Sequence, residues 1–435
     1  MLNEQQQKAC ALIVDWYLNR TQEKQIFTLA GYAGTGKTFL VNYIIDEDLE
    51  IPRNKVAYVT PTGKAASVLI QRGSDAMTIH RLIYNAVEVE YDNTVNGKSV
   101  KSKRIEFVKK PEIPNYKLII VDETSMVEEK IMKDLLSFGI PILCCGDSGQ
   151  LPPIFKSNGL LEHPDFTLTE IVRQSSDNAI VQVATAARNA VPLKFGNINN
   201  EVIVSCTNNL MKEQYKNLLL KSDQIICGTN ITRRKINDEV RLFKGIDSSR
   251  KYPTEGEKII CTVNNWELYL DDEKKYNLVN GTIGYCHNFR IINPEEHIGM
   301  IDFEPDFLPG TILKNILIDI GIFENYQYTF DMHQRAYIMP DNSIVLKENF
   351  RREDDETIEE FKSRVFENVL AGRKAVDDVQ VNRFEFAYAI SCHKSQGSEW
   401  NKVLLFDESS IFGSDANRWL YTGITRSKKK LVILK

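Results

Sequence analysis

The chain has 435 residues, of which 43% are apolar and 26% are charged, and its formal net charge at pH 7 is −5. This length and composition are those of an ordinary soluble protein with room for two full-sized domains and insertions. Eight cysteines without a CxxC pair argue against a zinc site. No signal peptide or membrane-spanning run is visible, so we expect an intracellular, cytoplasmic location and no membrane partner.

Residues 31–38 read Gly-Tyr-Ala-Gly-Thr-Gly-Lys-Thr and predict a phosphate-binding loop. The apolar run 25–30 predicts a buried strand before the loop, and residues 39–45 suit a helix after it. Glycines let the backbone wrap around phosphates, and the amides at the helix start bind anionic oxygens. A Gly-rich turn that binds nothing is the alternative, and the strand-loop-helix context argues against it. We assign ATP to Gly31, Ala33, Gly34, Thr35, Gly36, Lys37 and Thr38, with the Thr38 hydroxyl also a ligand of Mg²⁺.

The segment Asn85–Lys110 alternates polar and β-prone residues around the turn-rich stretch Asp92–Gly97. This pattern fits a β-hairpin inserted into the α/β region. A surface excursion without function is the alternative, because long connections between elements vary freely.

An apolar run at 116–121 predicts a central parallel strand that ends in Asp122 and Glu123. Ligands bind at the carboxyl ends of such strands, so Asp122 is expected to hold Mg²⁺ and Glu123 to polarise the attacking water. Without the upstream loop, an Asp-Glu pair after a strand would be read as a solvated turn. The run 140–145 predicts a second such strand, whose vicinal Cys144 and Cys145 are expected in the core. Its polar loop places Gln150 within reach of a γ-phosphate or its water.

The second half begins with a predicted strand and polar loop at 224–230 and a helix at 231–243. Predicted strands and helices no longer alternate in residues 253–376, and short predicted strands there suggest a small barrel. The acidic, helix-prone stretch 352–373 is expected to present a solvated charged face. We expect the parallel sheet to resume at 384–390 and to end with 430–434. The three runs that suggest the barrel are Lys258–Val263, Val279–Tyr285 and Asp341–Leu346.

Several segments follow one another in an order that resembles the motifs of superfamily 1 helicases. The last two resemble its RecD-like branch, superfamily 1B, and the compact size resembles the phage members more than the longer bacterial ones. This resemblance spans Gln6 to Arg426 and implies two RecA-like P-loop motor domains with parallel sheets. The segments are Pro-Thr-Gly-Lys-Ala-Ala at 61–66, Thr-Ile-His at 78–80, Val-Asp-Glu-Thr-Ser-Met at 121–126, Gly-Asp-Ser-Gly-Gln-Leu-Pro-Pro at 146–153, Ala389–Glu399 and Leu420–Ser427.

The resemblance also implies the domain organisation. Motor domain 1A is expected at 1–83 and 112–200, and motor domain 2A at 201–252 and 377–435. The hairpin at 84–111 corresponds to a pin domain, 1B, placed to meet a duplex fork. Residues 253–376 correspond to an SH3-like barrel, 2B.

Four further residues take expected roles at the nucleotide. Arg426, in a Thr-Arg pair expected on a helix, resembles an arginine finger, and Arg173 resembles the arginine that contacts the γ-phosphate. A lone arginine is otherwise usually a surface ion-pair partner. Gln6 resembles the glutamine that reads adenine, although three adjacent glutamines leave the register open. Glu399 matches the residue that contacts ribose.

The resemblance implies single-stranded DNA and forked duplex DNA as partners, with replication or single-strand-binding proteins as further candidates, and a monomer. The implied activity is ATP-dependent 5′→3′ strand separation. An RNA helicase, or a P-loop ATPase stimulated by nucleic acid without strand separation, remains the alternative. For two of the implied DNA contacts, His80 and His393, a structural role is also open. The implied contacts are Pro61, Thr62, Lys64, His80, Thr229, Asn230, Ser391 and His393.

Overall fold

Contacts between residues divide the chain into two units, Met1–Ile236 with Ala389–Lys435, and Asn237–Tyr388. No helix in the described ranges is both long and apolar enough to cross a bilayer. The computed structural model describes residues 2–21, 24–71, 73–95, 98–152, 158–171, 178–247, 249–271, 276–295, 297–329, 334–338, 344–346 and 377–435.

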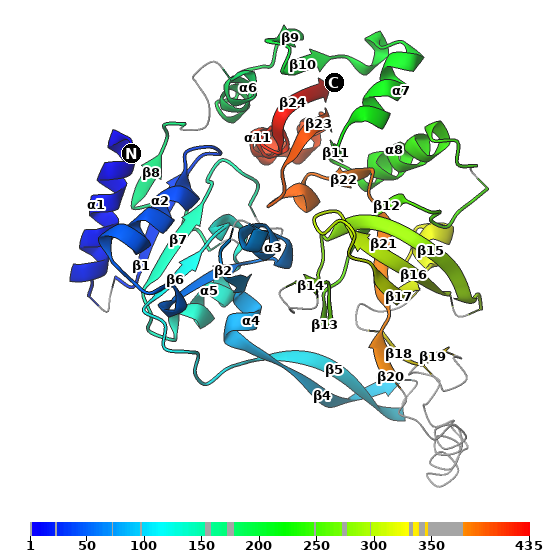
Figure 1. Ribbon diagram of the computed structural model, residues 1–435, viewed down its shortest axis with the longest axis horizontal. Helices are drawn as coiled ribbons and strands as arrows, with labels where there is room; N and C mark the ends of the chain where they lie inside the picture. Colours follow the sequence, from blue (N-terminus) through cyan, green and yellow to red (C-terminus); the bar gives the residue numbers. More distant parts are fainter. Residues whose placement is uncertain are drawn as a thin grey trace. The chain divides into compact units, whose positions relative to one another are not determined.

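The first sheet of the first unit contains six parallel strands in the order β3-β2-β6-β7-β1-β8 (Figure 1). Its strands are short apolar runs because helices cover both faces, as in other parallel sheets. The strands are β1 Ile26–Gly31, β2 Val56–Thr60, β3 Ala76–Thr78, β6 Leu118–Val121, β7 Ile142–Gly146 and β8 Phe166–Leu168, and the helices are α1 Glu4–Asn19, α2 Lys37–Tyr43, α3 Gly63–Gln71, α4 Ile79–Ile83 and α5 Glu129–Leu136.

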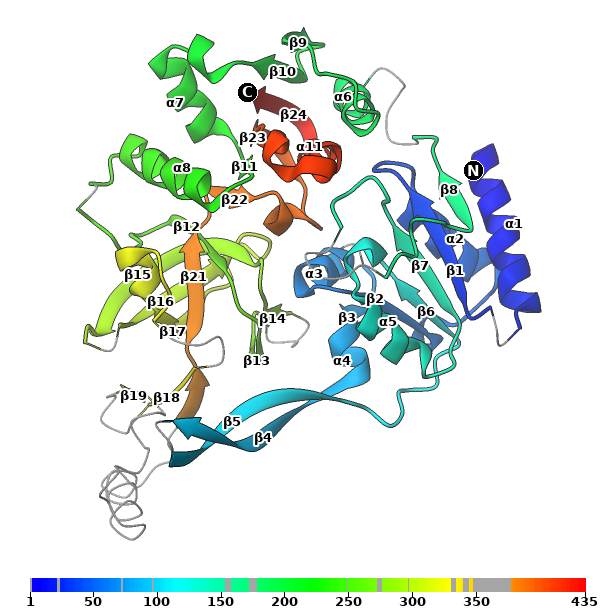
Figure 2. The same cartoon turned by 180° about the vertical axis from the view of Figure 1, so that it is seen from behind.

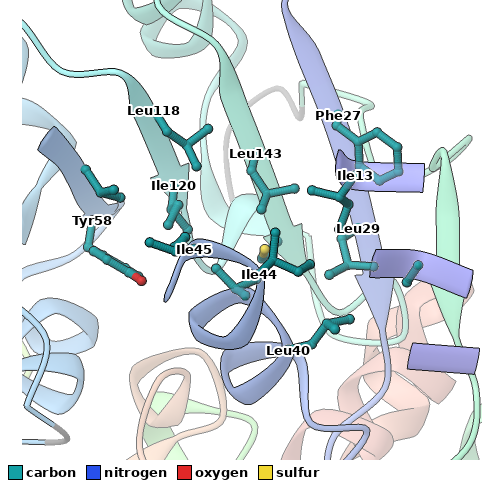
Figure 3. Packing of buried hydrophobic residues seen from close by; sticks show 14 of the residues in the cluster. Ile13, Phe27, Leu29, Leu40, Ile44, Ile45, Tyr58, Leu118, Ile120 and Leu143 are labelled. Carbon is teal, nitrogen blue, oxygen red and sulfur yellow. The ribbon is translucent and has the colours of Figure 1, made fainter. Parts of the chain in front are cut away.

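Alternate residues of these strands fill two separate cores. On one face, Ile13 of α1 and Leu40 of α2 pack in one cluster with Leu143 of β7 (Figure 3). On the other face, α4 and α5 cover a second cluster. Cys144 and Cys145 lie in the second and first cluster respectively, which confirms the prediction that both are core residues.

A second six-stranded sheet in the same unit has the order β22-β11-β23-β24-β10-β9, and all its pairs are parallel except β10 with β9. Figure 2 shows helix α11 beside β23 and β24. Trp419 of this helix is fully buried in one cluster with residues of both strands. The strands are β9 Gly196–Ile198, β10 Val202–Ser205, β11 Gln224–Cys227, β22 Ala389–Ser391, β23 Trp400–Phe406 and β24 Ser427–Leu434, and the helices are α6 Ala179–Arg188, α7 Lys212–Lys221, α11 Ala416–Ile424 and α8 Asn230–Phe243, which continues into the second unit at Asn237.

The predicted hairpin is present as two long antiparallel strands, β4 Tyr84–Val95 and β5 Lys98–Lys109. Its turn is shorter than predicted, because Asp92–Val95 belongs to β4 and Val95 pairs with Lys98. The connection is therefore Asn96-Gly97, which lies outside the described residues. Asn-Gly is the dipeptide that two-residue hairpin turns favour.

The second unit is built on a closed five-stranded barrel, β12-β15-β16-β17-β21. Phe303 and Phe384 are fully buried in its core, with ring centroids 5.0 Å apart. The barrel and the two parallel sheets confirm the predicted α/β class with its two insertions. The elements are β12 Glu257–Cys261, β13 Asn265–Tyr269, β14 Asn277–Leu278, β15 Ile283–Asn293, β16 Ile298–Pro305, β17 Leu313–Asp319, α9 Gly321–Asn325, β18 Arg335–Ile338, β19 Ile344–Leu346, β20 Asp377–Gln380 and β21 Asn382–Phe386.

Two predicted strands differ from the structure. The run 384–390 was expected to be one strand of the motor sheet, but β21 completes the barrel and only β22 joins the second sheet. An apolar run does not show where the hydrogen-bonding partner changes, so the predicted boundary at residue 377 is wrong. Likewise, β19 pairs with β18 in a separate three-stranded sheet and not in the barrel. The predicted acidic stretch 352–373 lies outside the described residues.

Candidate active site

The loop between β1 and α2 is shaped by two glycines in the left-handed region. Gly34 has a φ of 83° and Gly36 a φ of 80°, a region that side chains other than glycine rarely adopt. Thr35 closes the loop, because its backbone N–H and its hydroxyl both donate to the Tyr32 carbonyl, at 3.2 and 2.8 Å. A Cβ on Gly31 would lie 2.8 Å from the Thr35 Oγ1. Gly31 and Thr35 therefore shape the cradle, while other loop residues face its opening.

Lys37 and Thr38 begin α2, where free amides and the helix dipole favour an anion. The Lys37 Nζ donates to the carbonyls of Gly31, at 2.5 Å, and Tyr32, at 3.2 Å. These carbonyls hold the ammonium group over the loop. A bound phosphate would therefore meet this charge already in place.

Asp122 and Glu123 follow β6, as predicted. The Asp122 Oδ1 accepts the Glu123 N–H at 2.9 Å, and Glu123 has a φ of 53°, an uncommon backbone conformation for a residue other than glycine. Burial, and then the negative charge of Asp122, raise the pKa of the Glu123 carboxyl above its usual range. A raised pKa suits a carboxylate that takes a proton from water.

The loop after β7 places Gln150 beside Asp147. The Gln150 Nε2 donates to the Asp147 Oδ2 at a long 3.4 Å. Its Oε1 is buried and has no hydrogen-bond partner within the described part of the chain. Gln150 also lines the cavity described below, so its amide oxygen is available to a ligand.

Arg426 was expected on a helix, but α11 ends at Ile424 and Arg426 lies in the short link to β24. Its side chain is 4% exposed and folds back on the chain. The guanidinium donates to the carbonyls of Thr422, at 3.0 Å, and Ser398, at 3.2 Å. These backbone acceptors fix the position of the charge without neutralising it, because a carbonyl carries no net charge.

Among the three adjacent glutamines, only Gln6 faces the loop. Its Nε2 donates to the Thr35 carbonyl at 3.2 Å, and its Oε1 accepts the Asn3 N–H at 3.1 Å. Gln7 is exposed and donates to the Leu2 carbonyl. Gln6 retains one amide hydrogen and one lone pair for a base. Of the three adjacent glutamines, Gln6 is therefore the one beside the P-loop, and its contact with adenine stays a prediction.

These residues surround one cavity of about 380 Å³. Thr38 and Asp122 both line it, so a residue with a hydroxyl and a residue with a carboxylate face the same cavity. Both groups are oxygen ligands of the kind that Mg²⁺ takes beside phosphate oxygens. Arg173 lies outside the described residues. Predicted site residues that line the cavity are Gln6, Ala33, Gly34, Gly36, Lys37, Thr38, Asp122, Glu123, Gln150, Glu399 and Arg426, of which Glu399 also pairs with Lys428 at 3.6 Å.

The eight residues predicted to contact DNA lie away from the P-loop strand, at one edge of each sheet. In the first sheet, Pro61, Thr62 and Lys64 follow β2, and His80 follows β3 at the sheet edge. In the second sheet, Thr229 and Asn230 follow β11, and Ser391 and His393 lie at the end of the edge strand β22. The two sets therefore occupy equivalent edges of two equivalent sheets.

The two histidines of these sets are packed against aromatic rings. His80 lies 5.4 Å from the Tyr84 ring and 5.5 Å from the Phe107 ring, and His393 lies 5.9 Å from Phe412. Burial lowers the pKa of both imidazoles. They are neutral at pH 7, so any contact with a phosphate would rest on a hydrogen bond and not on charge.

Sequence reasoning missed Tyr421. Its ring is 2% exposed, and its hydroxyl accepts the Ala33 N–H at 3.0 Å and donates to the Asp147 Oδ2 at 2.8 Å. Burial, and then the charge of Asp147, raise the pKa of this hydroxyl, so it keeps its proton. A tyrosine within an apolar helix reads as a core residue, and no local signal marks two partners so far away along the chain.

Two family models match the chain, an AAA domain over residues 1–209 and a UvrD-like helicase C-terminal domain over residues 386–434. The ATP-dependent DNA helicase dda of Enterobacteria phage T4 is 31% identical over 39% of this chain and 39% of its own length. The ATP-dependent RecD2 DNA helicase of Deinococcus radiodurans is 32% identical over 38% of this chain and 22% of its own length. The alignments thus span less than half of each relative.

The structure of a Pif1 helicase from Bacteroides in complex with ADP-AlF3 and single-stranded DNA has the same fold. The match covers 100% of this chain and 92% of that chain, with 20% identity and a TM-score of 0.50. At this identity the likeness concerns the fold.

Proposed function

We propose that this chain is an ATP-dependent DNA helicase of superfamily 1B, as its motifs predicted. It hydrolyses ATP to move along single-stranded DNA in the 5′→3′ direction and to separate duplex strands. The relatives named helicases support this proposal, and the site gives it a chemical basis.

One observation carries the proposal: the P-loop and Arg426 line the same cavity. The P-loop belongs to the first sheet, whereas Arg426 precedes β24 of the second. A P-loop ATPase built on a single sheet would not need the second sheet or an arginine from it. In a motor, charge that arrives from a second domain makes hydrolysis depend on how the domains are arranged.

Each residue of the cavity has a role in this reaction. The P-loop amides and Lys37 bind the phosphates, and Glu123 accepts a proton from the attacking water. Gln150 orients that water or contacts the γ-phosphate, and Arg426 stabilises the charge that develops in the transition state. Thr38 and Asp122 would hold Mg²⁺, which neutralises phosphate charge when bound. Gln6 contacts adenine, Glu399 contacts ribose, and Arg173 remains a candidate for the γ-phosphate.

The DNA path uses the equivalent edges of the two sheets. Hydroxyl, amide and imidazole groups there suit contacts to phosphates and sugars, which carry no base specificity. The β4–β5 hairpin acts as the pin that meets the fork, and the barrel corresponds to the SH3-like domain. The enzyme acts as a monomer on single-stranded and forked DNA.

The first test measures ATP hydrolysis without polynucleotide, with single-stranded DNA and with single-stranded RNA. Stimulation by DNA above the other two conditions is expected. Equal stimulation by RNA would instead favour an RNA helicase, and no stimulation by either would reject a translocase.

The second test uses duplexes with a single-stranded tail at one end only. Unwinding from a 5′ tail and not from a 3′ tail is expected. Preference for a 3′ tail would reject the assigned direction, whereas stimulated hydrolysis without unwinding from any tail would leave an ATPase that does not separate strands.

A further inference from the structure

The Tyr421 hydroxyl joins two loops of the first sheet to a helix that packs on the second. The hydroxyl accepts a hydrogen bond from the Ala33 N–H of the P-loop and donates one to Asp147 in the loop after β7. Tyr421 itself belongs to α11, which packs on β23 and β24. One oxygen atom therefore ties the phosphate-binding loop, the Gln150 loop and α11 together.

The ring of Tyr421 fits closely against these loops. A Cβ on Gly149 would lie 2.9 Å from the Tyr421 Cε1, so glycine is needed there for the approach. The Tyr32 ring meets it edge-on, with centroids 6.5 Å apart. The neighbouring Thr422 adds a second tie, because its hydroxyl accepts the Leu151 N–H at 2.9 Å. The hydroxyl is thus held in place from several sides.

Tyr421 and Gln150 donate to the same oxygen of Asp147. The hydroxyl lies 2.8 Å from the Asp147 Oδ2, whereas the Gln150 Nε2 lies 3.4 Å from it. The other oxygen, Oδ1, accepts the Gly149 N–H at 2.9 Å. Because the shorter bond dominates, the carboxylate is satisfied mainly by Tyr421, and the Gln150 amide is held only weakly.

We propose that Tyr421 is a positioning residue for ATP hydrolysis, whose hydroxyl satisfies Asp147 and thereby leaves Gln150 free to meet the γ-phosphate or its water. This inference rests on the proposed function. Without the hydroxyl, the Gln150 amide becomes the side-chain donor to the Asp147 Oδ2 and is drawn away from the ligand. Turnover then falls. ATP binding does not weaken, because the Ala33 N–H loses its protein acceptor and stays available to a phosphate.

The test is Tyr421→Phe, which removes only the hydroxyl. In saturating single-stranded DNA, we expect kcat for ATP to fall about tenfold, as for the loss of one hydrogen bond made to a charged group, while KM does not rise. The Kd of a fluorescent ADP analogue, measured without turnover, is also expected not to rise. A merely structural residue would instead raise KM and Kd as the protein loosens.

Tyr388→Phe is the matched control, because Tyr388 is also buried and its hydroxyl donates to a buried carboxylate, Glu257, at 3.4 Å in the second unit. Its kcat is expected to stay within about twofold of wild type. Melting temperatures are measured first, and all variants are compared where each is folded. Unchanged kcat in Tyr421→Phe, or a KM that rises as kcat falls, would overturn the inference.

A double-mutant cycle with Gln150→Ala tests the route of the effect. In the Gln150→Ala background, Tyr421→Phe is expected to lower kcat by less than about twofold, since Gln150 transmits the effect. If Tyr421→Phe lowers kcat about tenfold in that background as well, Tyr421 acts independently of Gln150, and the inference is overturned. If the wild-type protein itself fails to hydrolyse ATP, the proposed function and this inference are both rejected. If the wild-type protein is active and Tyr421→Phe has the same kcat, only the inference is rejected.

Discussion

The two six-stranded sheets of the first unit share the arrangement of five parallel strands, β3-β2-β6-β7-β1 and β22-β11-β23-β24-β10, but carry different loops at the same position. In each sheet the fifth strand, β1 or β10, leads through a loop to a helix, α2 or α7. The loop after β1 has glycines that open its amides to a phosphate. The loop after β10 spans residues 206–211, contains no glycine, and is tied by the Thr207 N–H to the Lys435 carbonyl at 3.0 Å. The scaffold thus permits a phosphate cradle, and only the loop sequence makes one.

The second sheet contributes to the nucleotide cavity by another route. Arg426 lies just past α11 and lines the cavity, and Tyr421 of α11 bonds to the P-loop. In the proposed reaction, phosphate binding and transition-state charge therefore come from different sheets. Each sheet is also interrupted once, the first by the hairpin after α4 and the second by the barrel after α8. We therefore expect substitutions in the P-loop, at Arg426 and in the hairpin to impair different properties of the protein.

Lys37→Ala is expected to have the largest effect, because it removes the charge that the P-loop carbonyls hold over the phosphate site. ATP hydrolysis should fall to the level of the protein-free reaction. Binding of single-stranded DNA should persist, since the proposed DNA path follows other strands. If Lys37→Ala hydrolyses ATP near the wild-type rate, the loop of the first sheet is not part of the catalytic site, and the proposed difference between the two sheets is wrong.

Arg426→Ala tests the contribution of the second sheet. We expect kcat to fall roughly a thousandfold with little change in KM for ATP, because a finger acts mainly in the transition state. Arg426→Lys is the matched variant. It keeps the charge but loses the planar fork that reaches the Thr422 and Ser398 carbonyls, so we expect only partial recovery. If Arg426→Ala raises KM and leaves kcat unchanged, Arg426 binds substrate and is not a finger.

The local parts of this arrangement were predictable from sequence. The P-loop, the Asp122-Glu123 pair and the hairpin each depend on one continuous stretch of chain, the longest being Tyr84–Lys109, where turn chemistry and strand periodicity decide the structure. The break in the run 384–390 was not predictable, because it depends on which distant strand each half pairs with. The hydrogen bond from the Ala33 N–H to the Tyr421 hydroxyl was missed for the same reason.

The choice of Gln6 over its neighbours shows the same limit. Helix periodicity puts Gln6 on the buried face of α1 with Ala9, Ile13 and Trp16, but what this face meets is known only once the helix is placed against the P-loop. Only then does the Thr35 carbonyl select Gln6. The position of Arg426 off the helix likewise depends on acceptors at Thr422 and Ser398 that packing brings together.

Shortening the hairpin tests the insertion in the first sheet. Removing Asp92–Val95 and Lys98–Lys101 joins Tyr91 to Ser102 through the same Asn96-Gly97 dipeptide, and preserves the strand register because four paired residues leave each strand. We expect unwinding of forked DNA to fall at least about tenfold, because a wedge acts only on the duplex. Hydrolysis stimulated by single-stranded DNA should persist in the same preparation. Loss of both activities would mean that the hairpin is structural.

Gln6→Ala is expected to have a moderate effect. It removes an amide that supports the Thr35 carbonyl and faces the cavity, so KM for ATP should rise by up to about tenfold. The preference for ATP over GTP, measured as the ratio of kcat/KM values, should shrink. Gln7→Ala is the control, since Gln7 is exposed on the same helix and its side-chain amide donates to the Leu2 carbonyl, away from the cavity. Equal effects of both substitutions would remove Gln6 from base recognition.

The smallest effect is expected at the loop after β10. Thr207→Ala removes a hydroxyl at the position of the second sheet that corresponds to the P-loop, and we expect kcat and KM for ATP to stay within about twofold of wild type. Thr38→Ala is the matched substitution in the first sheet, and it should lower hydrolysis strongly because Thr38 lines the nucleotide cavity and its hydroxyl is the proposed ligand of Mg²⁺. Equilibrium dialysis with an ATP analogue should give one nucleotide for each chain. Two nucleotides for each chain, with one lost in Thr207→Ala, would show that the second sheet also binds phosphate and that glycine is not what separates the two loops.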